Sequence, residues 1–377
     1  MAENKDKKVL NVPNLRFPEF EGEWQETRLK EISKFSKERL NSIELSCCNY
    51  VTTENMLQDY KGIVSATNLP TNTNVVKFSK GDVLLSNIRP YLKKVWYADR
   101  NGGCSADVFV FKALPICNSN FLHHVIANDR FIKFVMGGAK GVKMPRGDKE
   151  QMITYKVGLP CIEEQKKIAT LLSLLDERIS TQNKIIEDLK KLKSAISKKL
   201  LDNDRWTTYK IQDIAKIGRG RVISSVEIER QKHPLYPVYS SQTSNDGIMG
   251  YLDDYMFDGE YITWTTDGAN AGTVFYRKGK FNCTNICGTL KIQPKYDCYF
   301  VSLVLQQATQ KYVSFNLANP KLMNNIMASI KIKMPDIEMQ KQLSKIFQTL
   351  DSCLLVHQRT CDMYSREKQY LLCQMFI

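Results

Sequence analysis

Residues 161–201 read CIEEQKKIATLLSLLDERISTQNKIIEDLKKLKSAISKKLL, a stretch that contains neither glycine nor proline. Its apolar residues recur mostly at intervals of three and four, the spacing of one face of an α-helix. From Leu175 to Ile196 they follow nearly a seven-residue repeat that Gln182 interrupts, which is typical of a coiled-coil seam. Acidic residues at the start and lysines at the end suit the helix dipole. The pattern predicts one helix, roughly 60 Å long.

A copy of this stretch ends the chain. The motif Pro-x-x-Glu-x-Gln-Lys begins at Pro160 and returns at Pro335, and the same offset places His357 at the polar position of Gln182. Because a long amphipathic helix needs an apolar surface to lie against, we expect each copy to serve as the other's partner. The residues expected on the helix–helix and partner-docking surfaces are Leu171, Leu175, Ile179, Ile186, Leu189, Ile346, Leu350, Leu354, Tyr364 and Leu371.

The segments before the two helices also correspond. Trp-x4-Leu-x2-Ile at Trp24 returns as Trp-x4-Ile-x2-Ile at Trp206, and each is followed by short β-branched and aromatic runs bounded by turn residues. We therefore predict a mixed α/β (α+β) fold of two globules joined by two long coiled-coil helices, with an internal repeat. The expected parts are a flexible N-terminus (1–17), a first globule (18–160), a central helix (161–203), a second globule (204–335) and a C-terminal helix (336–377).

Composition narrows the class of protein. The 377 residues carry a net charge of +14, which favours a polyanionic partner. No apolar run approaches the length of a membrane span and the N-terminus lacks a signal-peptide core, so we expect a cytoplasmic protein without a membrane partner. The eleven cysteines show no paired metal-knuckle spacing and are interpreted as reduced thiols.

Motifs for chemistry are missing from the sequence. There is no Walker A loop, no GxGxxG after a predicted strand and no defensible pairing of a nucleophile with a base. His123 and His124 lie on a predicted helix without a ligand partner in sequence. We therefore predict a binding protein with no catalytic residues, no metal site and no cofactor of its own.

The duplicated layout resembles the specificity subunit of type I restriction–modification systems. The resemblance rests on the helix starts at Pro160 and Pro335, the tryptophan starts at Trp24 and Trp206, the run YITWTTDGAN at residues 261–270 and the C-terminal tail. It implies that each globule is a target-recognition domain reading one half of a split, asymmetric DNA sequence. It also implies that the two helices pack antiparallel, with a pseudo-two-fold relation, and hold the globules apart.

The same resemblance implies partners and cofactors. The helices would dock two modification (methyltransferase) subunits, which restriction (endonuclease and translocase) subunits can join. The modification subunits use S-adenosylmethionine and the restriction subunits use ATP and Mg²⁺. The assembled complex would methylate adenine and cleave foreign DNA in anti-phage defence, and this chain would supply the recognition of double-stranded DNA.

Candidate DNA contacts gather on two loops in each globule. Phosphates are bound by cations and amides, and bases are read in the major groove by arginine and amide side chains. The candidates in the first globule are Asn87, Arg89, Tyr91, Lys93, Lys94, Lys140, Lys143, Arg146 and Lys149. Those in the second globule are Arg219, Arg221, Ser241, Gln242, Thr266, Asn270, Lys321, Asn324 and Asn325.

Two other functions are compatible with parts of this pattern. A coiled-coil adaptor that joins two proteins without touching DNA would explain the helices, but the charge and the polar loops argue against it. An enzyme that acts on DNA by itself would explain the charge, but the missing motifs argue against it.

Overall fold

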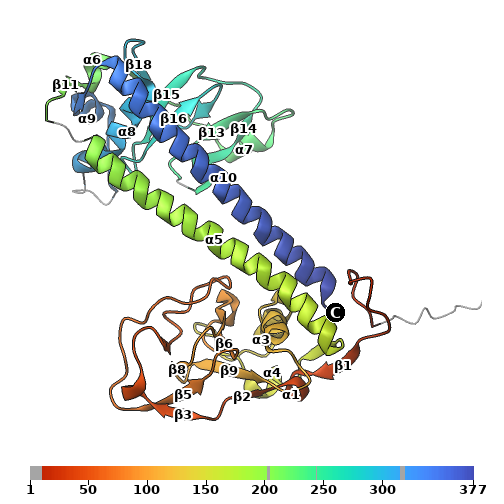
Figure 1. The fold of residues 1–377 in the computed structure, drawn as a ribbon. Coiled ribbons are helices and arrows are strands. Elements are labelled where there is room, and N and C mark those ends of the chain that lie inside the picture. The colour runs from red at the N-terminus through yellow and green to blue at the C-terminus, as the bar shows by residue number, and fades with distance from the viewer. Residues whose placement is uncertain (1–10, 202–203, 243, 315–318) are drawn as a thin grey trace, which may run out of the picture. The chain divides into compact units, whose positions relative to one another are not determined.

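The computed structural model describes residues 11–201, 204–242, 244–314 and 319–377. It divides into two compact units: unit 1 comprises residues 1–185 and 357–377, and unit 2 comprises residues 186–356. Both predicted long helices are present, α5 (Ile162–Leu200) and α10 (Ile337–Met375), and each contributes residues to both units (Figure 1). The first ten residues of the predicted flexible N-terminus lie outside the described residues.

Unit 1 contains two four-stranded sheets and a short strand pair that joins the two ends of its globule. The pair is β1 (Gln25–Arg28) with β10 (Lys156–Leu159), antiparallel. The first sheet has the order β2 (Ser33–Phe35), β9 (Val108–Ala113), β6 (Val83–Ser86) and β7 (Val95–Tyr97). The second has the order β3 (Arg39–Asn41), β5 (Asn74–Phe78), β8 (Gly102–Cys104) and β4 (Tyr50–Val51). The short helices are α1 (Leu29–Ile32), α2 (Ser119–Ile126), α3 (Asp129–Gly137) and α4 (Lys149–Met152).

Unit 2 repeats the closing pair and the first sheet of unit 1 with different residues, but its second sheet has three strands instead of four. Its closing pair is β11 (Thr207–Lys210) with β19 (Lys331–Met334). The sheet β12 (Ala215–Arg219), β18 (Cys287–Ile292), β15 (Glu260–Thr265) and β16 (Val274–Lys278) has the strand order of the first sheet of unit 1. A three-stranded sheet follows the order β14 (Ile248–Leu252), β13 (Tyr236–Tyr239) and β17 (Asn282–Cys283). The short helices are α6 (Ile211–Ile214), α7 (Ser225–Glu229), α8 (Cys298–Ala308) and α9 (Asn324–Ser329).

Each core includes the start of one long helix and the end of the other. In unit 1, Trp24 and Phe121 are buried with Leu172 of α5 and with Met375 and Phe376 at the C-terminus. The unit 2 core likewise combines Phe347 of α10 with Leu201, just beyond the end of α5. Burial of these helix ends stabilises helices that would fray if isolated. The repeated tryptophan and isoleucine spacing found in the sequence is thus a repeated core.

Repeated ion pairs show that the long helices pack antiparallel. Lys368 of α10 binds Asp176 of α5 in unit 1, and Lys193 of α5 binds Asp351 of α10 in unit 2. Because Asp176 and Lys193 correspond to Asp351 and Lys368 in the sequence repeat, these are the same contact made twice. Within each unit, this confirms the predicted antiparallel packing of the two helices.

The polar interruptions of the two helices meet each other. His357 Nδ1 and Gln182 Oε1 lie 2.7 Å apart, and both residues belong to unit 1. They are counterparts in the sequence repeat, so each polar interruption is the partner of the other. A polar pair at one seam position fixes the register of a coiled coil, since a shifted register would leave both groups against apolar residues.

The ten residues predicted for the helix–helix and partner-docking surfaces differ in their exposure to solvent. Leu175 and Ile186 are buried, whereas Ile346 remains 44% exposed and is available to a partner. The half-buried remainder are Leu171, Ile179, Leu189, Leu350, Leu354, Tyr364 and Leu371.

The glutamine of the repeated helix-start motif has a structural role. The side-chain oxygen of Gln165 accepts from Asn118 N at 2.8 Å, and its nitrogen donates to Pro160 O at 2.9 Å. Gln340 makes the same two bonds, to Asp297 N at 3.0 Å and Pro335 O at 2.8 Å. Asn118 and Asp297 cap α2 and α8, so the motif ties each long helix to its globule.

Replacing Gln165 by leucine should destabilise unit 1 by roughly 2–3 kcal/mol, because buried backbone groups would lose their partners. The midpoint of urea denaturation of the full chain would measure this loss. The control is Gln348→Leu, at an exposed position of α10. Equal midpoints for the two variants would contradict the role assigned to Gln165.

Candidate nucleic-acid interface

The structure brings the two predicted loops of the first globule together. The β6–β7 loop (residues 87–94) and the loop before α4 (residues 138–148) are joined by two backbone bonds, Arg89 N to Pro145 O at 2.8 Å and Gly147 N to Asn87 O at 3.2 Å. Asn87 N also donates to Asp107 O at 2.8 Å in the turn before β9. We call this arrangement the loop clasp of unit 1.

Unit 2 has an equivalent loop clasp. The β15–β16 loop binds the segment before α9 through Gly268 N to Pro320 O at 3.0 Å and Leu322 N to Thr266 O at 2.9 Å. Thr266 N donates to Ile286 O at 3.0 Å, as Asn87 N does to its own turn in unit 1. The backbone framework is therefore the same in both units, whereas the side chains that it presents differ.

Buried aromatic packing supports the clasp of unit 2. The indole of Trp264 is fully buried and donates to Leu322 O at 2.9 Å. Gly288 of the neighbouring strand lies under this ring, where an added Cβ would approach its atoms to 2.2 Å. Only glycine fits beneath the ring, which holds the strand and the loop in register.

The clasp of unit 1 presents several cations to solvent. Arg89, Tyr91, Lys140, Lys143, Arg146 and Lys149 are exposed, and Asn87, Lys93 and Lys94 are half-buried. Within the described part of the chain, the side chains of Arg89 and Lys143 have no ion-pair partner. Positive φ angles of 52° at Arg89 and 53° at Lys93 bracket the turn Pro90–Leu92, on which Tyr91 projects.

Other cations of this clasp are already held by the protein. Lys93 pairs with Asp129 at 2.9 Å, and Arg146 lies 3.4 Å from Asp107. Lys140 pairs with Asp148 at 2.7 Å, and this hydrogen bond raises the pKa of the Lys140 ammonium. Burial lowers the pKa of Lys94, whose ammonium donates to the carbonyl of Thr53. Lys149 lies over the rings of Phe35 and Phe109, at 5.2 and 4.8 Å.

In unit 2 one predicted contact residue is interior. Thr266 is fully buried, and its hydroxyl accepts from Arg219 at 2.9 Å. In this chain the hydroxyl of Thr266 therefore positions Arg219, and a direct DNA contact by Thr266 stays a prediction. Arg219 and Lys321 both lie near Asp267, at 3.6 and 3.4 Å, so two cations share one carboxylate.

The remaining candidates of unit 2 lie around this centre. Asn270 Nδ2 lies 3.5 Å from Ser241 O, which links the β15–β16 loop to the β13–β14 turn that also carries Gln242. Asn324 Nδ2 donates to Gly218 O at 3.4 Å, and Asn325 is exposed. Arg221 is paired with Glu227, which competes with any phosphate for this guanidinium.

Arg277 shapes this surface although no local sequence pattern marks it. Arg277 of β16 is only 4% exposed, and its guanidinium lies 3.6 Å from the ring centre of Tyr239 and 4.4 Å from that of Phe275. It donates to the carboxylate and the carbonyl of Asp246, both at 2.8 Å. It thereby holds the turn Ser244–Gly247, next to Gln242. Its role depends on contacts between strands, which no local sequence signal reveals.

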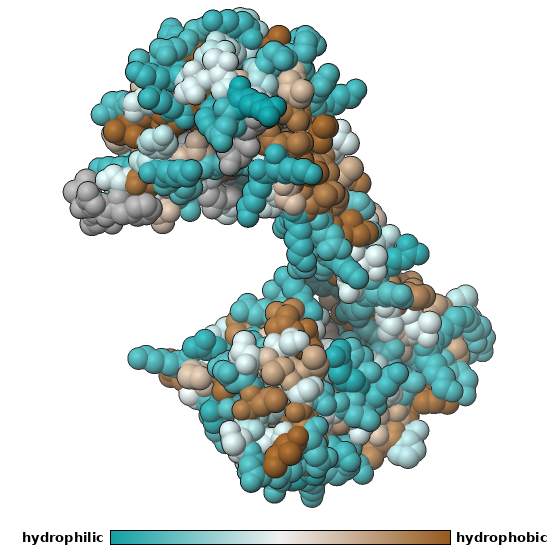
Figure 2. All heavy atoms as spheres, turned by 60° about the vertical axis from the view of Figure 1, so that its left-hand side comes forward, coloured by the Kyte–Doolittle hydropathy of each residue, from teal (hydrophilic) through white to brown (hydrophobic). Residues whose placement is uncertain are grey.

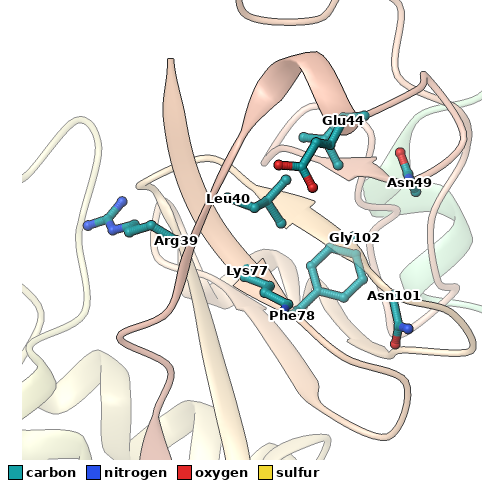
Figure 3. A pocket seen from close by; sticks show the side chains of 9 residues that line it. Arg39, Leu40, Glu44, Asn49, Lys77, Phe78, Asn101 and Gly102 are labelled. Carbon is teal, nitrogen blue, oxygen red and sulfur yellow. The ribbon is translucent and has the colours of Figure 1, made fainter. Parts of the chain in front are cut away.

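A cavity of about 310 Å³ opens on the second sheet of unit 1 (Figure 3). Arg39, Lys77 and Glu44 line it together with the ring of Phe78. Among its described lining residues there is no pairing of a nucleophile with a base. Its mixed charges resemble an ordinary polar surface more than a reaction centre.

His123 and His124 lie near Asp176, and the potential ligand atoms of all three residues fall within 4.8 Å of one another. The carboxylate of Asp176 could not be predicted as a neighbour of the two histidines, because it belongs to α5, which is distant in sequence. The ammonium of Lys368 already pairs with Asp176, and its charge disfavours a divalent cation. We assign no metal to this cluster.

The same cluster should make stability depend on pH. His124 is fully buried, and burial lowers the pKa of its imidazole well below the ordinary value, with His123 and Lys368 adding to the effect. In the unfolded chain the imidazole of His124 binds a proton below about pH 6.5, whereas in the folded chain it stays neutral. The free energy of unfolding therefore decreases as the pH falls through that value. Between pH 7 and pH 5, we expect the free energy of unfolding to decrease by roughly 2 kcal/mol more in the wild type than in His124→Leu.

Denaturation curves at the two pH values would measure this difference. The control is His233→Leu, which alters an exposed histidine and should keep the wild-type dependence on pH. An unchanged dependence in His124→Leu would rule out this source of acid sensitivity.

The visible surface of both units is largely hydrophilic, with apolar residues in smaller patches (Figure 2). Across the described residues, no helix combines the length and apolar character needed to cross a membrane. A duplicated mixed α/β domain with a polar, cation-bearing loop clasp, carried on an antiparallel helix pair, defines a class of DNA-recognition protein.

Comparison with known proteins agrees. The family model described as the type I restriction modification DNA specificity domain matches residues 21–191 and 203–361. The chain belongs to this family of specificity subunits, so it is a recognition subunit of a restriction–modification system and is not itself the enzyme.

Two relatives from Mycoplasma pneumoniae illustrate the similarity. A protein that bears the name of a type I specificity subunit is 36% identical over 238 residues, covering 60% of this chain and 96% of the relative. The type I restriction enzyme MpnII specificity subunit is 39% identical over 178 residues, covering 46% of this chain and 53% of that protein.

Two solved structures share the fold. The crystal structure of the S subunit from M. genitalium matches with a TM-score of 0.73 at 16% identity, covering 97% of this chain and 99% of that one. A chain from a study of complex assembly and conformational transition in the type I system matches with a TM-score of 0.52 at 16% identity, covering 93% and 96%. At this identity the likeness concerns the fold alone.

Proposed function

We propose that this chain reads a bipartite, asymmetric DNA sequence, with one loop clasp on each half. The observation that carries the proposal is the repetition of one backbone framework with different side chains. Unit 1 presents Arg89 and Lys143, whereas unit 2 presents Arg219, Lys321 and Asn325. Identical frameworks can approach two DNA segments in the same way, and different side chains then select different bases.

We further propose that the helix pair spaces the two clasps and docks two modification subunits. A packed pair of long helices is stiff enough to set a separation on the order of one DNA turn, about 34 Å. The pseudo-two-fold relation offers similar surfaces to two copies of one partner, and restriction subunits then join. S-adenosylmethionine, ATP and Mg²⁺ would be bound by these partners, and the complex would act on DNA in the cytoplasm.

Filter binding of the full chain to duplex DNA at varied salt tests the proposal. We expect binding that weakens steeply with salt, because phosphate contacts release counterions. Binding should tighten when modification subunits are added. A chain that co-purifies with those subunits but shows no salt-dependent DNA binding would be an adaptor, and the proposal would fail.

A further inference from the structure

The loop clasp of unit 1 carries a fully exposed apolar side chain. Val142 is 100% exposed and Met144 is 48% exposed, in the short loop between Lys140 and Arg146. Gly141, with a φ angle of +94°, turns the chain just before Val142. An exposed valine is unremarkable alone, so its surroundings decide its meaning.

The base of this loop is firmly held. Lys140 and Arg146 exchange two backbone hydrogen bonds, each of 2.9 Å. Pro145 is buried, and its carbonyl accepts from Arg89 N at 2.8 Å. The backbone therefore projects Val142 outward, and none of the residues that the structure describes covers it.

The charged residues around Val142 restrict which kind of partner can cover its side chain. Lys140, Lys143, Arg146 and Arg89 are all exposed on the same clasp. A partner must supply negative charge around an apolar spot, which excludes purely apolar surfaces. The major groove of DNA meets this requirement, since phosphates line it and the thymine 5-methyl group is the apolar feature on its floor.

We propose that Val142 reads a thymine in the half-site bound by unit 1, through contact with the thymine 5-methyl group. Lys143 and Arg146 would hold the flanking phosphates and set the depth of the tip. This assignment rests on the proposed function and adds one specificity-determining residue to it. It concerns unit 1 alone, because the corresponding segment of unit 2 has a different sequence.

The test combines one protein change with one DNA change. The full chain, assembled with its modification subunits, is titrated with the duplex that carries its methylated motif. In further duplexes, each thymine of the unit 1 half-site is replaced in turn by deoxyuridine, which lacks only the methyl group. We expect Val142→Ser to weaken binding by about 5- to 10-fold, and one deoxyuridine position to weaken the wild type similarly. Val142→Ser should show no further loss at that position.

Several outcomes would overturn the assignment. The assignment fails if Val142→Ser binds DNA as tightly as the wild type. It also fails if Val142→Ser binds more weakly but no deoxyuridine position abolishes the difference from the wild type. A thermal melt of Val142→Ser guards against misfolding, and Val142→Ile should retain tight binding. Salt-dependent binding by the wild type without a valine effect would refute only this inference, whereas a wild type that binds no DNA would refute the proposed function.

Discussion

Replacing Leu175 by glutamate is expected to destabilise the helix pair of unit 1 by about 3–5 kcal/mol. Leu175 is 9% exposed, on the seam side of α5. The new carboxylate would lose its hydration and would lie beside Asp176, so repulsion adds to desolvation. Thermal denaturation would measure the loss of stability, and co-purification should show loss of the modification subunits.

The adjacent residue provides a matched control for stability. Leu174 is 55% exposed, so Leu174→Glu should change the unfolding free energy by less than about 0.5 kcal/mol. The repeat also predicts that Leu350→Glu, the counterpart in unit 2, behaves like Leu175→Glu. Normal melting together with normal co-purification in Leu175→Glu would contradict the role of the seam.

Replacing Lys140 and Lys143 together by glutamine should weaken DNA binding on the order of tenfold at moderate salt and reduce the slope of log K against log salt by about 0.9 to 1.8. The change removes two cations from an exposed loop without disturbing a core. Because Asp148 already pairs with Lys140, the Lys143 single variant should account for the larger part of the effect. Filter binding at four or more salt concentrations would measure the slope.

Lys156 supplies a control that is charge-matched to the Lys143 single variant. It is an exposed lysine of unit 1 on β10, paired with Glu26 and outside both loops of the clasp. Lys156→Gln should therefore leave the slope unchanged. A wild-type slope in the double variant would remove this loop from the DNA footprint.

The features that sequence could predict are those with local or periodic causes. Both long helices followed from unbroken apolar spacing, and their relation followed from a repeat that holds in register from Pro160 onward. The two loops of each unit could be predicted because turn residues and cations stand between β-rich runs. Their meeting in a clasp could not, because the bond from Arg89 N to Pro145 O joins residues far apart in sequence.

Individual side-chain roles depended on tertiary packing. Thr266 is a polar residue in a loop, which favours a DNA contact. In the structure it is buried, and its hydroxyl accepts a hydrogen bond from Arg219. Arg277 is a charged residue of the kind expected on an exposed strand face. In the structure its guanidinium lies between the rings of Tyr239 and Phe275 and binds Asp246. The exposure of Val142 could not be predicted for the opposite reason, since an apolar residue in a basic loop is as often buried as exposed.

DNA recognition by this chain is tested most directly by mapping methylated bases across the genome of a strain that normally modifies its DNA, with and without the gene for this chain. We expect deletion to erase adenine methylation at one bipartite motif and to leave all other methylated motifs intact. Restoring the gene should restore that motif alone. A methylation pattern that is identical with and without the gene would contradict the assigned role.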